Sequence, residues 1–334
     1  MSHSFRSLAS VFGTAFMTLL GIEAYLHVSC RPPMHLDEVD DGIAALSAAD
    51  PDTLLVGSSH ARSFNGVARD VSTQAGHVSM VNVPVENGRW SSYAWVIEHR
   101  VRPVLAALES IGHHRLTRFI LLTDTWDACG TGAPEWNLPS RAWQLRDFAK
   151  DFSTHGMTDY NRNYVRHETE RLLQFSFLLN DRGKGQLVPN VLSKLGITGQ
   201  RAIDDGSRLR DWQRDFESHW RDPRCHDLEA VKSLQYILQW AKERGLETWI
   251  VTFPRKPATS TELGIRSTRK PFMQFIQATA NHWGARVIDL ASTYPIADED
   301  FLPDWDHLTA EGNTKFSKWT LSHEMAFLRE APKR

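Results

Sequence analysis

Two short blocks far apart in the chain carry residues that could act together in nucleophilic catalysis. The first is Gly57-Ser58-Ser59, which follows the apolar run LLV and precedes a predicted helix. A serine at the carboxyl end of a buried strand lies at the sheet edge where open α/β folds bind ligands. The glycine permits a tight turn, and N–H groups at the start of the helix can stabilise an oxyanion. A serine here can equally be an ordinary helix cap, so this block alone leaves both roles open.

The second block is Asp304-Trp305-Asp306-His307, followed by Thr309. An aspartate three residues before a histidine can place its carboxylate beside the imidazole. The carboxylate then fixes the tautomer and stabilises the imidazolium that forms when the histidine takes a proton from serine. The chain has 15 histidines, so a histidine near an aspartate is also expected by chance. Thr309 could instead cap the last predicted helix, with Asp306 an ordinary loop residue.

The elements around these blocks predict an α/β domain with a central parallel sheet of about five strands. Five short runs rich in Val, Ile and Leu are expected to be strands buried on both faces. They begin at Thr53 (TLLVGS), Val78 (VSMVNV), Arg118 (RFILLT), Thr248 (TWIVTF) and Arg286 (RVIDLA). Amphipathic segments alternate with them, which is typical of a parallel sheet covered by helices. Helices are predicted for residues 90–110, 228–244, 268–283 and 309–328.

Residues 127–227 interrupt this alternation. They are rich in aromatic and charged side chains, include helical stretches such as residues 160–180, and contain no convincing buried strand. We interpret the region as a helical insertion between the third and fourth strands. It could simply cap the sheet, or it could form a lid or a polymer-binding surface.

Composition excludes several classes of protein. The 334 residues carry a net charge of -2, with 41% hydrophobic and 23% charged residues, which is unlike a disordered, collagenous or multi-span membrane protein. The nearly neutral charge argues against a nucleic-acid binder. Cys30, Cys129 and Cys225 are too few for a disulfide scaffold or a four-cysteine zinc site. Since the sequence has no metal motif or phosphate loop, we expect no metal and no cofactor.

The N-terminal segment has the composition of a membrane anchor. The run LASVFGTAFMTLLGI (residues 8–22) continues past Glu23 to give about 20 largely apolar residues, the length that crosses a bilayer as a helix. No clear small-x-small cleavage site precedes Cys30, and His27 stands where a lipoprotein signal has an aliphatic residue. Glu23 and His27 count against a spanning helix, because ionisable groups are costly in hydrocarbon. We favour an uncleaved anchor over residues 1–30, with a cleaved signal and a soluble helix as alternatives.

The flanking charges predict an orientation. Arg6 precedes the apolar segment, whereas an acidic stretch that includes Asp37 and Glu38 follows it. By the positive-inside rule, the N-terminus lies in the cytoplasm. The expected protein is a single-pass protein of the inner (cytoplasmic) membrane, in which a linker (residues 31–50) leads to a domain (residues 51–330) in the periplasm or outside the cell. That location would permit a disulfide between Cys129 and Cys225.

Together the two blocks resemble the SGNH/GDSL hydrolase superfamily, whose first block is Gly-Asp-Ser and whose last is Asp-x-x-His. The resemblance covers residues 50–125 and 245–325, and it implies a flavodoxin-like three-layer fold. It also implies that Ser59 is the nucleophile, His307 the general base and Asp304 the acid that orients it. The order of the blocks argues against an ordinary α/β-hydrolase, in which the nucleophile comes later in the chain and the acid lies well before the histidine.

The middle blocks depart from the family pattern. Members carry a glycine after the second strand that donates to the oxyanion, and here Gly88 or Asn87 occupies that region. They also carry Gly-x-Asn-Asp after the third strand. This chain has DTWD (residues 124–127), so Trp126 replaces the oxyanion-hole asparagine. Loss of one such donor costs about 100- to 1000-fold in rate, which predicts a replacement group or a slow, specialised activity. The expected oxyanion hole combines the N–H of Ser59 with Gly88 or Asn87.

Ser58 stands where the family has aspartate. This variant resembles the branch that modifies cell-envelope polymers, which includes O-acetyltransferases of alginate-type exopolysaccharides and D-alanyl transfer proteins. Many members of that branch have an N-terminal anchor and work beside a membrane-bound O-acyltransferase. The resemblance therefore implies serine-dependent acyl transfer or ester hydrolysis on an extracytoplasmic glycan, foremost the O-acetylation of an exopolysaccharide, with such an acyltransferase as partner.

Several residues beside the blocks are candidates for substrate contacts. Arg62 could hold an anionic substrate, although a surface salt bridge is the favoured interpretation. Trp90, Trp126 and Trp305 could stack against sugars, but most of the 12 tryptophans are expected to pack in the core or on the surface. His60 adjoins the serine and is expected to have a local structural role.

Two other functions remain open. A non-catalytic glycan-binding or scaffold protein could keep the fold after losing turnover, as the missing asparagine would allow. A secreted esterase of broad substrate range would use the same serine and histidine, but without an anchor or a polymer.

Overall fold

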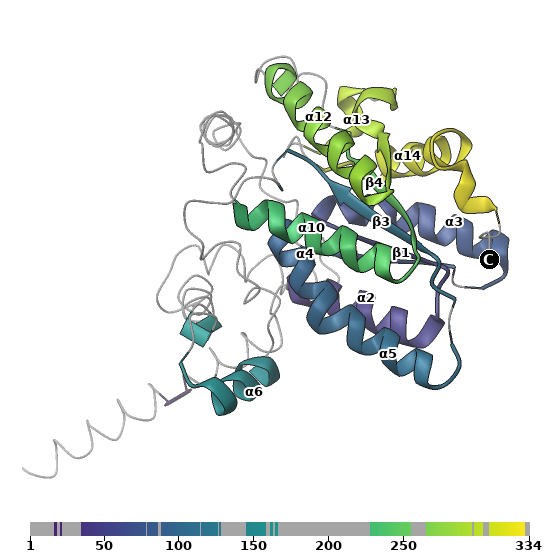
Figure 1. Cartoon of the computed structure of the whole chain (residues 1–334). Coiled ribbons are helices and arrows are strands. Elements are labelled where there is room, and N and C mark those ends of the chain that lie inside the picture. Colours follow the sequence, from purple (N-terminus) through teal and green to yellow (C-terminus); the bar gives the residue numbers. More distant parts are fainter. Residues whose placement is uncertain are drawn as a thin grey trace, which may run out of the picture. The chain divides into compact units, whose positions relative to one another are not determined.

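The computed structural model (Figure 1) describes a large part of the chain. The chain divides into two compact units. One unit comprises His35–Asp147 and Asp204–Arg334, and it holds the sheet and both sequence blocks; the other comprises Met1–Met34 and Phe148–Ile203. The described residues are 17–18, 21, 35–77, 79–85, 88–113, 115–125, 127, 145–157, 161–162, 164–165, 228–254, 265–295, 297–302 and 307–330.

Five parallel strands form the sheet in the order β2-β1-β3-β4-β5. This order is compatible with a flavodoxin-like fold, in which ligands bind outside the carboxyl ends of the strands near the switch point between β1 and β3. The prediction of an α/β domain with a five-stranded parallel sheet is therefore confirmed. The strands are β1 (Thr53–Gly57), β2 (Met80–Pro84), β3 (Arg118–Thr123), β4 (Glu247–Thr252) and β5 (Arg286–Asp289).

Helices connect the strands and follow the sheet. Those before β3 are α2 (His35–Ala49), η1 (Ser59–Phe64), α3 (Asn65–Ala75), α4 (Trp90–Val96), the π-helical turn η2 (Ile97–Val101) and α5 (Arg102–Ser110). Those after β3 in this unit are α10 (Leu228–Glu243), α12 (Ile265–Trp283), α13 (Leu290–Thr293), η5 (Asp298–Asp300), α14 (Ala310–Ser322) and η6 (Ala326–Arg329). All four predicted helices are present, and the one predicted over residues 90–110 contains a π turn.

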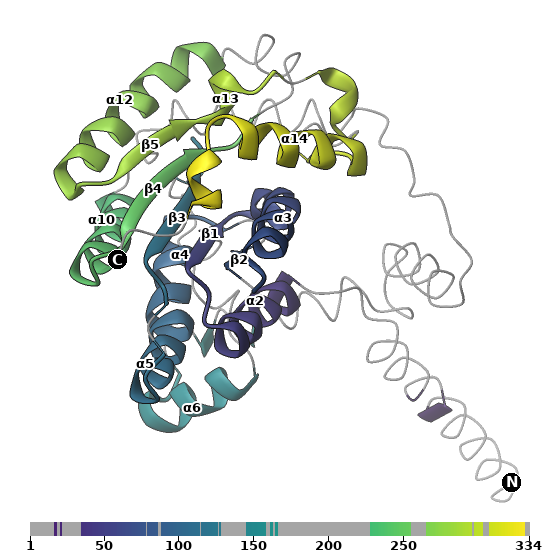
Figure 2. The same ribbon diagram turned by 90° about the vertical axis from the view of Figure 1, so that its right-hand side faces the viewer.

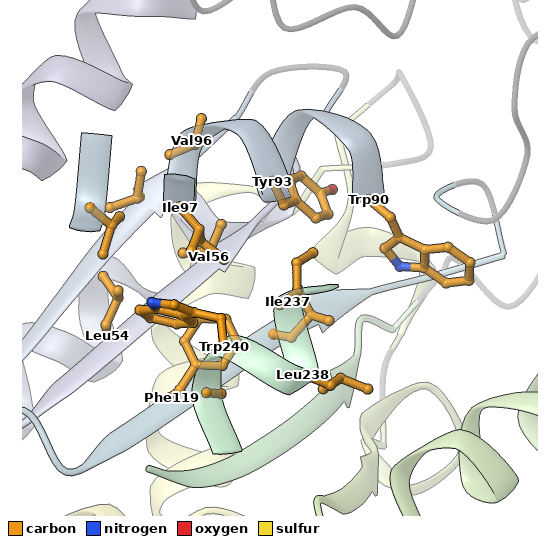
Figure 3. Packing of buried hydrophobic residues seen from close by; sticks show 14 of the residues in the cluster. Leu54, Val56, Trp90, Tyr93, Val96, Ile97, Phe119, Ile237, Leu238 and Trp240 are labelled. Carbon is orange, nitrogen blue, oxygen red and sulfur yellow. The ribbon is translucent and has the colours of Figure 1, made fainter. Parts of the chain in front are cut away.

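The sheet separates two hydrophobic cores. Side chains alternate along each strand, so Leu54 and Val56 enter the core under α2, α4, α5, α10 and α12, whereas Leu55 enters the core under α3, α14 and η6. Figure 2 shows α3 and α14 covering one side of the sheet. In Figure 3, Leu54, Val56 and Phe119 of the sheet lie among side chains of α4 and α10. Burial on both faces explains why β1, β3 and β4 are rich in Val, Ile and Leu. The edge strand β5 differs from the expectation, because only Ile288 of its residues is buried.

Residues 35–49, which we expected to be part of a linker, form α2. Val39 and Leu46 on this helix are buried in the first core. Gly42 allows the helix to approach β2 closely, because a Cβ atom there would lie 2.6 Å from the carbonyl oxygen of Asn82. The linker prediction is therefore wrong from His35 onward, and α2 belongs to the sheet-containing unit.

The predicted anchor and insertion lie largely outside the described residues. Of residues 1–30, only 17, 18 and 21 are described. None of the helices that the structure describes combines the length and the apolar composition of a membrane span. Within residues 127–227, α6 (Leu145–His155) is helical, and Phe148 stacks on Phe152 with ring centroids 5.6 Å apart. Cys129 and Cys225 are not among the described residues.

Candidate active site

Ser59 and His307 come together at the carboxyl edge of the sheet. The Oγ atom of Ser59 lies 2.9 Å from Nε2 of His307, although the two residues are 248 positions apart. Ser59 directly follows the turn at the end of β1 and is buried, while His307 is half-buried. This distance is within the hydrogen-bonding range that a nucleophile and its general base require. The structure thus brings together the serine and the histidine of the two sequence blocks.

The turn at the end of β1 determines where Ser59 lies. A Cβ atom on Gly57 would be 2.6 Å from Cβ of Leu122, so glycine is needed where β1 passes β3. The N–H of Val85 donates to the carbonyl of Gly57 at 2.8 Å, and this bond ties the segment after β2 to the same turn. Ser59 begins η1, and the first N–H groups of a helix have no acceptor within the helix. Its N–H therefore has no acceptor within that helix, which the predicted oxyanion role requires.

Backbone hydrogen bonds hold His307 from both sides. The N–H of Leu302 donates to the carbonyl of His307 at 2.8 Å, and the N–H of Thr309 donates to the carbonyl of Asp300 at 2.7 Å. The Thr309 side chain accepts a hydrogen bond from the first turn of α14, so it caps that helix as one interpretation of the sequence expected. Thr309 thus caps α14, whereas His307 contacts Ser59.

His60 packs between the serine turn and β4. Its Nδ1 atom lies 3.0 Å from Oγ of Ser58 and 3.8 Å from Oδ2 of Asp124. The His60 ring stacks on Phe253, with centroids 4.5 Å apart and planes inclined by 16°, and its centroid is 5.4 Å from that of His307. With 4% of its surface exposed, His60 is in the position expected of a local structural residue.

A second buried polar group joins the turns that follow β2 and β3. The Tyr93 hydroxyl lies 3.1 Å from the Gly88 carbonyl oxygen and 3.1 Å from Oδ1 of Asp127. The N–H of Asp124 donates to Oδ2 of Asp127 at 3.1 Å. Burial raises the pKa of Asp127 well above its ordinary range, and the Asp124 carboxylate raises it further. Burial also raises the pKa of Tyr93, with added contributions from the Asp127 and Asp124 carboxylates.

Sequence reasoning missed Tyr93 and did not assign a role to Asp127. Tyr93 lies within the apolar pattern of a helix, and such a pattern predicts a core residue without revealing a polar contact at its hydroxyl. Asp127 is only the last residue of a block that departs from the family. The signal that could have found it is its position four residues after Thr123, at the carboxyl end of a buried strand.

The structure does not agree equally with the oxyanion donors that the sequence predicts. The N–H of Gly88 donates to the carbonyl of Val85 at 2.8 Å, so an oxyanion role for Gly88 would require this turn to open. Asn87 and Trp126 lie outside the described residues. Ser59 is therefore the predicted donor whose surroundings in the structure agree with that role.

The residues predicted to contact substrate lie in different surroundings. Arg62 forms an ion pair with Glu38 of α2, in which Nε donates to Oε1 and Nη2 lies near Oε2, both at 2.7 Å. This confirms the salt-bridge interpretation of Arg62. Trp90 is fully buried, and its Nε1–H donates to Oγ1 of Thr123 at 2.9 Å. It is a core residue (Figure 3) and, contrary to prediction, offers no surface for stacking on a sugar. Trp305 lies outside the described residues.

The acid of the predicted triad is not placed, because Asp304 and the alternative Asp306 lie outside the described residues. Among the residues that are described, no cluster of three or more His, Cys, Asp or Glu side chains could hold a metal ion. The sequence matches no protein-family model, and no curated protein matches it. A buried serine that contacts an imidazole at 2.9 Å can be deprotonated by it during attack on a carbonyl carbon.

Proposed function

We propose that this protein is a serine-dependent acyltransferase or esterase in which Ser59 is the nucleophile and His307 the general base. The observation that carries the proposal is the 2.9 Å contact between Oγ of Ser59 and Nε2 of His307 at the carboxyl edge of the sheet. The location also supports it, because open α/β folds bind their ligands at that edge.

The proposed reaction has two steps. As Oγ of Ser59 attacks an ester carbonyl, His307 accepts its proton; the tetrahedral intermediate collapses, and His307 returns the proton to the departing alcohol. An acceptor hydroxyl, deprotonated by His307, then attacks the acyl-serine and releases Ser59. The Ser59 N–H is the proposed oxyanion donor, and Asp304 remains the proposed orienting acid.

Transfer to a sugar hydroxyl and hydrolysis by water use the same residues. Two features favour transfer. The first is the burial of Ser59, which is 7% exposed, because limited access of water reduces competing hydrolysis. The second is the resemblance of the GSSH block to enzymes that acylate cell-envelope polymers. The proposed acceptor is accordingly an extracytoplasmic glycan, and the proposed reaction is its O-acetylation. The compartment rests on the apolar N-terminal segment, and the proposed partner is a membrane-bound O-acyltransferase.

An acetyl-transfer assay tests the proposal. The full-length protein would be incubated with an aryl acetate, with and without acidic and neutral oligosaccharides, while release of the aryl alcohol and mass of the oligosaccharide are followed. We expect an oligosaccharide that gains acetyl groups with wild type and gains none with Ser59→Ala. Ser63→Ala, a matched change at another buried serine of η1, should behave as wild type.

The other outcomes identify the alternatives. Rapid Ser59-dependent release of aryl alcohol without acetylated oligosaccharide would contradict glycan transfer and support a broad-range esterase. Equal, low rates for folded wild type and Ser59→Ala would contradict the catalytic proposal and support a glycan-binding protein.

A further inference from the structure

The hydrogen atoms available around Tyr93 determine the state of Asp127. The Tyr93 hydroxyl has one hydrogen and lies 3.1 Å from two oxygens, the Gly88 carbonyl and Oδ1 of Asp127. A carbonyl oxygen can only accept, and so can an ionised carboxylate. If Asp127 were ionised, two acceptors would compete for one hydrogen, and one of these buried contacts would be left without a hydrogen bond.

A proton on Oδ1 of Asp127 satisfies both contacts. The Asp127 O–H then donates to Tyr93, and the Tyr93 O–H donates to the Gly88 carbonyl. The other carboxyl oxygen, Oδ2, keeps its hydrogen bond from the N–H of Asp124. Burial favours the same state, because Asp127 is 2% exposed and a buried carboxylate is costly unless it is compensated.

The groups that face Asp127 shift its pKa in opposite directions. Tyr93 of α4 contacts its side chain, and Asp124 of the same turn adds a second carboxylate. Asp124 in turn lies 3.8 Å from His60 of η1. Hydrogen bonds from the Asp124 backbone N–H and from the Thr123 and Tyr93 side chains lower the pKa of Asp127. Burial and the Asp124 carboxylate outweigh them and leave that pKa well above its ordinary range.

The Tyr93–Asp127 pair is connected to the turn that carries Ser59 by two routes. In the first, Asp127 and Tyr93 hold the Gly88 segment, and the N–H of Val85 in that segment donates to the carbonyl of Gly57 at 2.8 Å. In the second, the Tyr93 hydroxyl has a hydrogen bond with Ser58, the residue directly before Ser59.

We propose that Asp127 is a neutral carboxylic acid in the resting protein and a positioning residue for Ser59. Through Tyr93 it joins the turns after β2 and β3 and thereby fixes the turn that carries Ser59. The positioning role rests on the proposed function of Ser59, whereas the protonation of Asp127 does not.

Infrared spectroscopy of the full-length protein tests the protonation. At neutral pH, wild type should show the carbonyl stretch of a protonated carboxylic acid, and Asp127→Asn should lack it. Asp289→Asn is the matched control, because Asp289 likewise lies at the carboxyl edge of this sheet, as the last residue of β5. Its pKa is raised by burial, but hydrogen bonds from Arg269, Thr252 and Ser292 lower it below the ordinary value. Asp289→Asn should keep the band. A band that is absent from folded wild type, or that survives in Asp127→Asn, would overturn the proposal.

Kinetics test the positioning role. The side-chain amide introduced by Asp127→Asn has the same hydrogen-bonding pattern as a carboxylic acid, with an N–H for Tyr93 and an oxygen for the N–H of residue 124. Asp127→Asn should therefore retain activity and lack the decline expected of wild type when the pH rises through the folded pKa of Asp127. Asp127→Ala and Tyr93→Phe should lower kcat by up to about 100-fold through displacement of Ser59. If Asp127→Asn were as impaired as Asp127→Ala, the positioning role would be overturned.

Thermal unfolding separates failure of this inference from failure of the proposed function. A folded carboxyl group with a raised pKa binds more protons than the unfolded chain, so it stabilises the protein at low pH. This contribution is lost as pH rises from about 3.9, the pKa in the unfolded chain, through the folded pKa. Asp127→Asn should remove that dependence even if wild type has no acyl-transfer activity. An unchanged dependence would contradict a neutral Asp127.

Discussion

The two edges of the sheet hold similar residue types in different surroundings. At the amino edge, His77 Nε2 lies 2.9 Å from Oδ2 of Asp52, and His113 Nδ1 lies 3.1 Å from Oδ2 of Asp50, around a polar hollow of 850 Å³. These two histidine side chains are 38% and 53% exposed. At the carboxyl edge, His307 instead contacts the hydroxyl of a buried serine.

This difference shows why a histidine beside an acid is weak evidence for catalysis. Both edges provide imidazoles with polar partners, but of the two only the carboxyl edge, in the described part of the chain, places an imidazole against a hydroxyl that could become a nucleophile. The histidines of the amino-edge pairs are partly exposed, and polar pairs that water reaches contribute little to stability. The proposed function therefore depends on the edge of the sheet at which a histidine lies.

The largest expected effect separates the two edges directly. His307→Ala should lower Ser59-dependent turnover by on the order of 10⁶-fold, because it removes the base that activates the serine. His77→Ala should leave turnover unchanged. Aryl ester hydrolysis by the purified variants provides the measurement. A comparable loss in both variants would contradict the distinction between the edges.

The next effect concerns two glycines near opposite edges. Gly57→Ala places Cβ 2.6 Å from Cβ of Leu122, so it should destabilise the protein by about 1–3 kcal/mol through overpacking and also displace Ser59. Gly112 has a φ of 82° and open space around it, so Gly112→Ala should cost about 1–2 kcal/mol in backbone strain alone. Denaturant unfolding measures both costs. Activity per folded molecule should fall only in Gly57→Ala, and a fall in both variants would count against the assigned role of this turn.

A smaller effect concerns acid stability at the end of β5. Burial raises the pKa of Asp289, but hydrogen bonds from Arg269, Thr252 and Ser292 outweigh it and lower the pKa below its ordinary value. Such a carboxylate stabilises the protein above its unfolded pKa, and this stabilisation is lost as pH falls through the lower, folded pKa. The unfolding temperature of wild type should therefore fall in acid, and that of Asp289→Asn should fall less. Equal pH dependence in the two proteins would contradict an ionised Asp289.

The smallest effect is expected at the amino edge. Asp52→Asn removes the partner of a histidine that is 38% exposed, so the free energy of unfolding should fall by about 1 kcal/mol or less. Urea unfolding at neutral pH measures it. A loss as large as that of Gly57→Ala would show that the amino edge contributes more than a solvated ion pair.

Much of the fold could be predicted from the sequence because the central strands β1, β3 and β4 are buried on both faces, which leaves little choice of side chain. The edge strand β5, in which only Ile288 is buried, still follows from its short apolar run. The helix α2 could not be recognised as easily. Val39 and Leu46 are seven positions apart and lie on one helical face, but the acidic residues between and around them gave this segment the composition of a linker.

The candidate site could be predicted only in part. Ser59 and His307 were identifiable because each is close to a recognisable boundary, one after a strand and the other before a helix. Trp90 was misjudged because its position beside a block does not reveal that its ring points into the core. The contacts of Tyr93 with Gly88 and Asp127 depend on how the turns after β2 and β3 meet, which no local pattern encodes.

The most direct measurement is labelling of the full-length protein with a fluorophosphonate probe, followed by mass spectrometry of the modified peptide. Wild type should be labelled at Ser59, because the probe reacts with a serine that a base has activated. Ser59→Ala and His307→Ala should remain unlabelled, and Ser63→Ala should be labelled as wild type. A folded wild type that is not labelled, or that is labelled at another serine, would contradict the assignment of Ser59 and His307 as nucleophile and base.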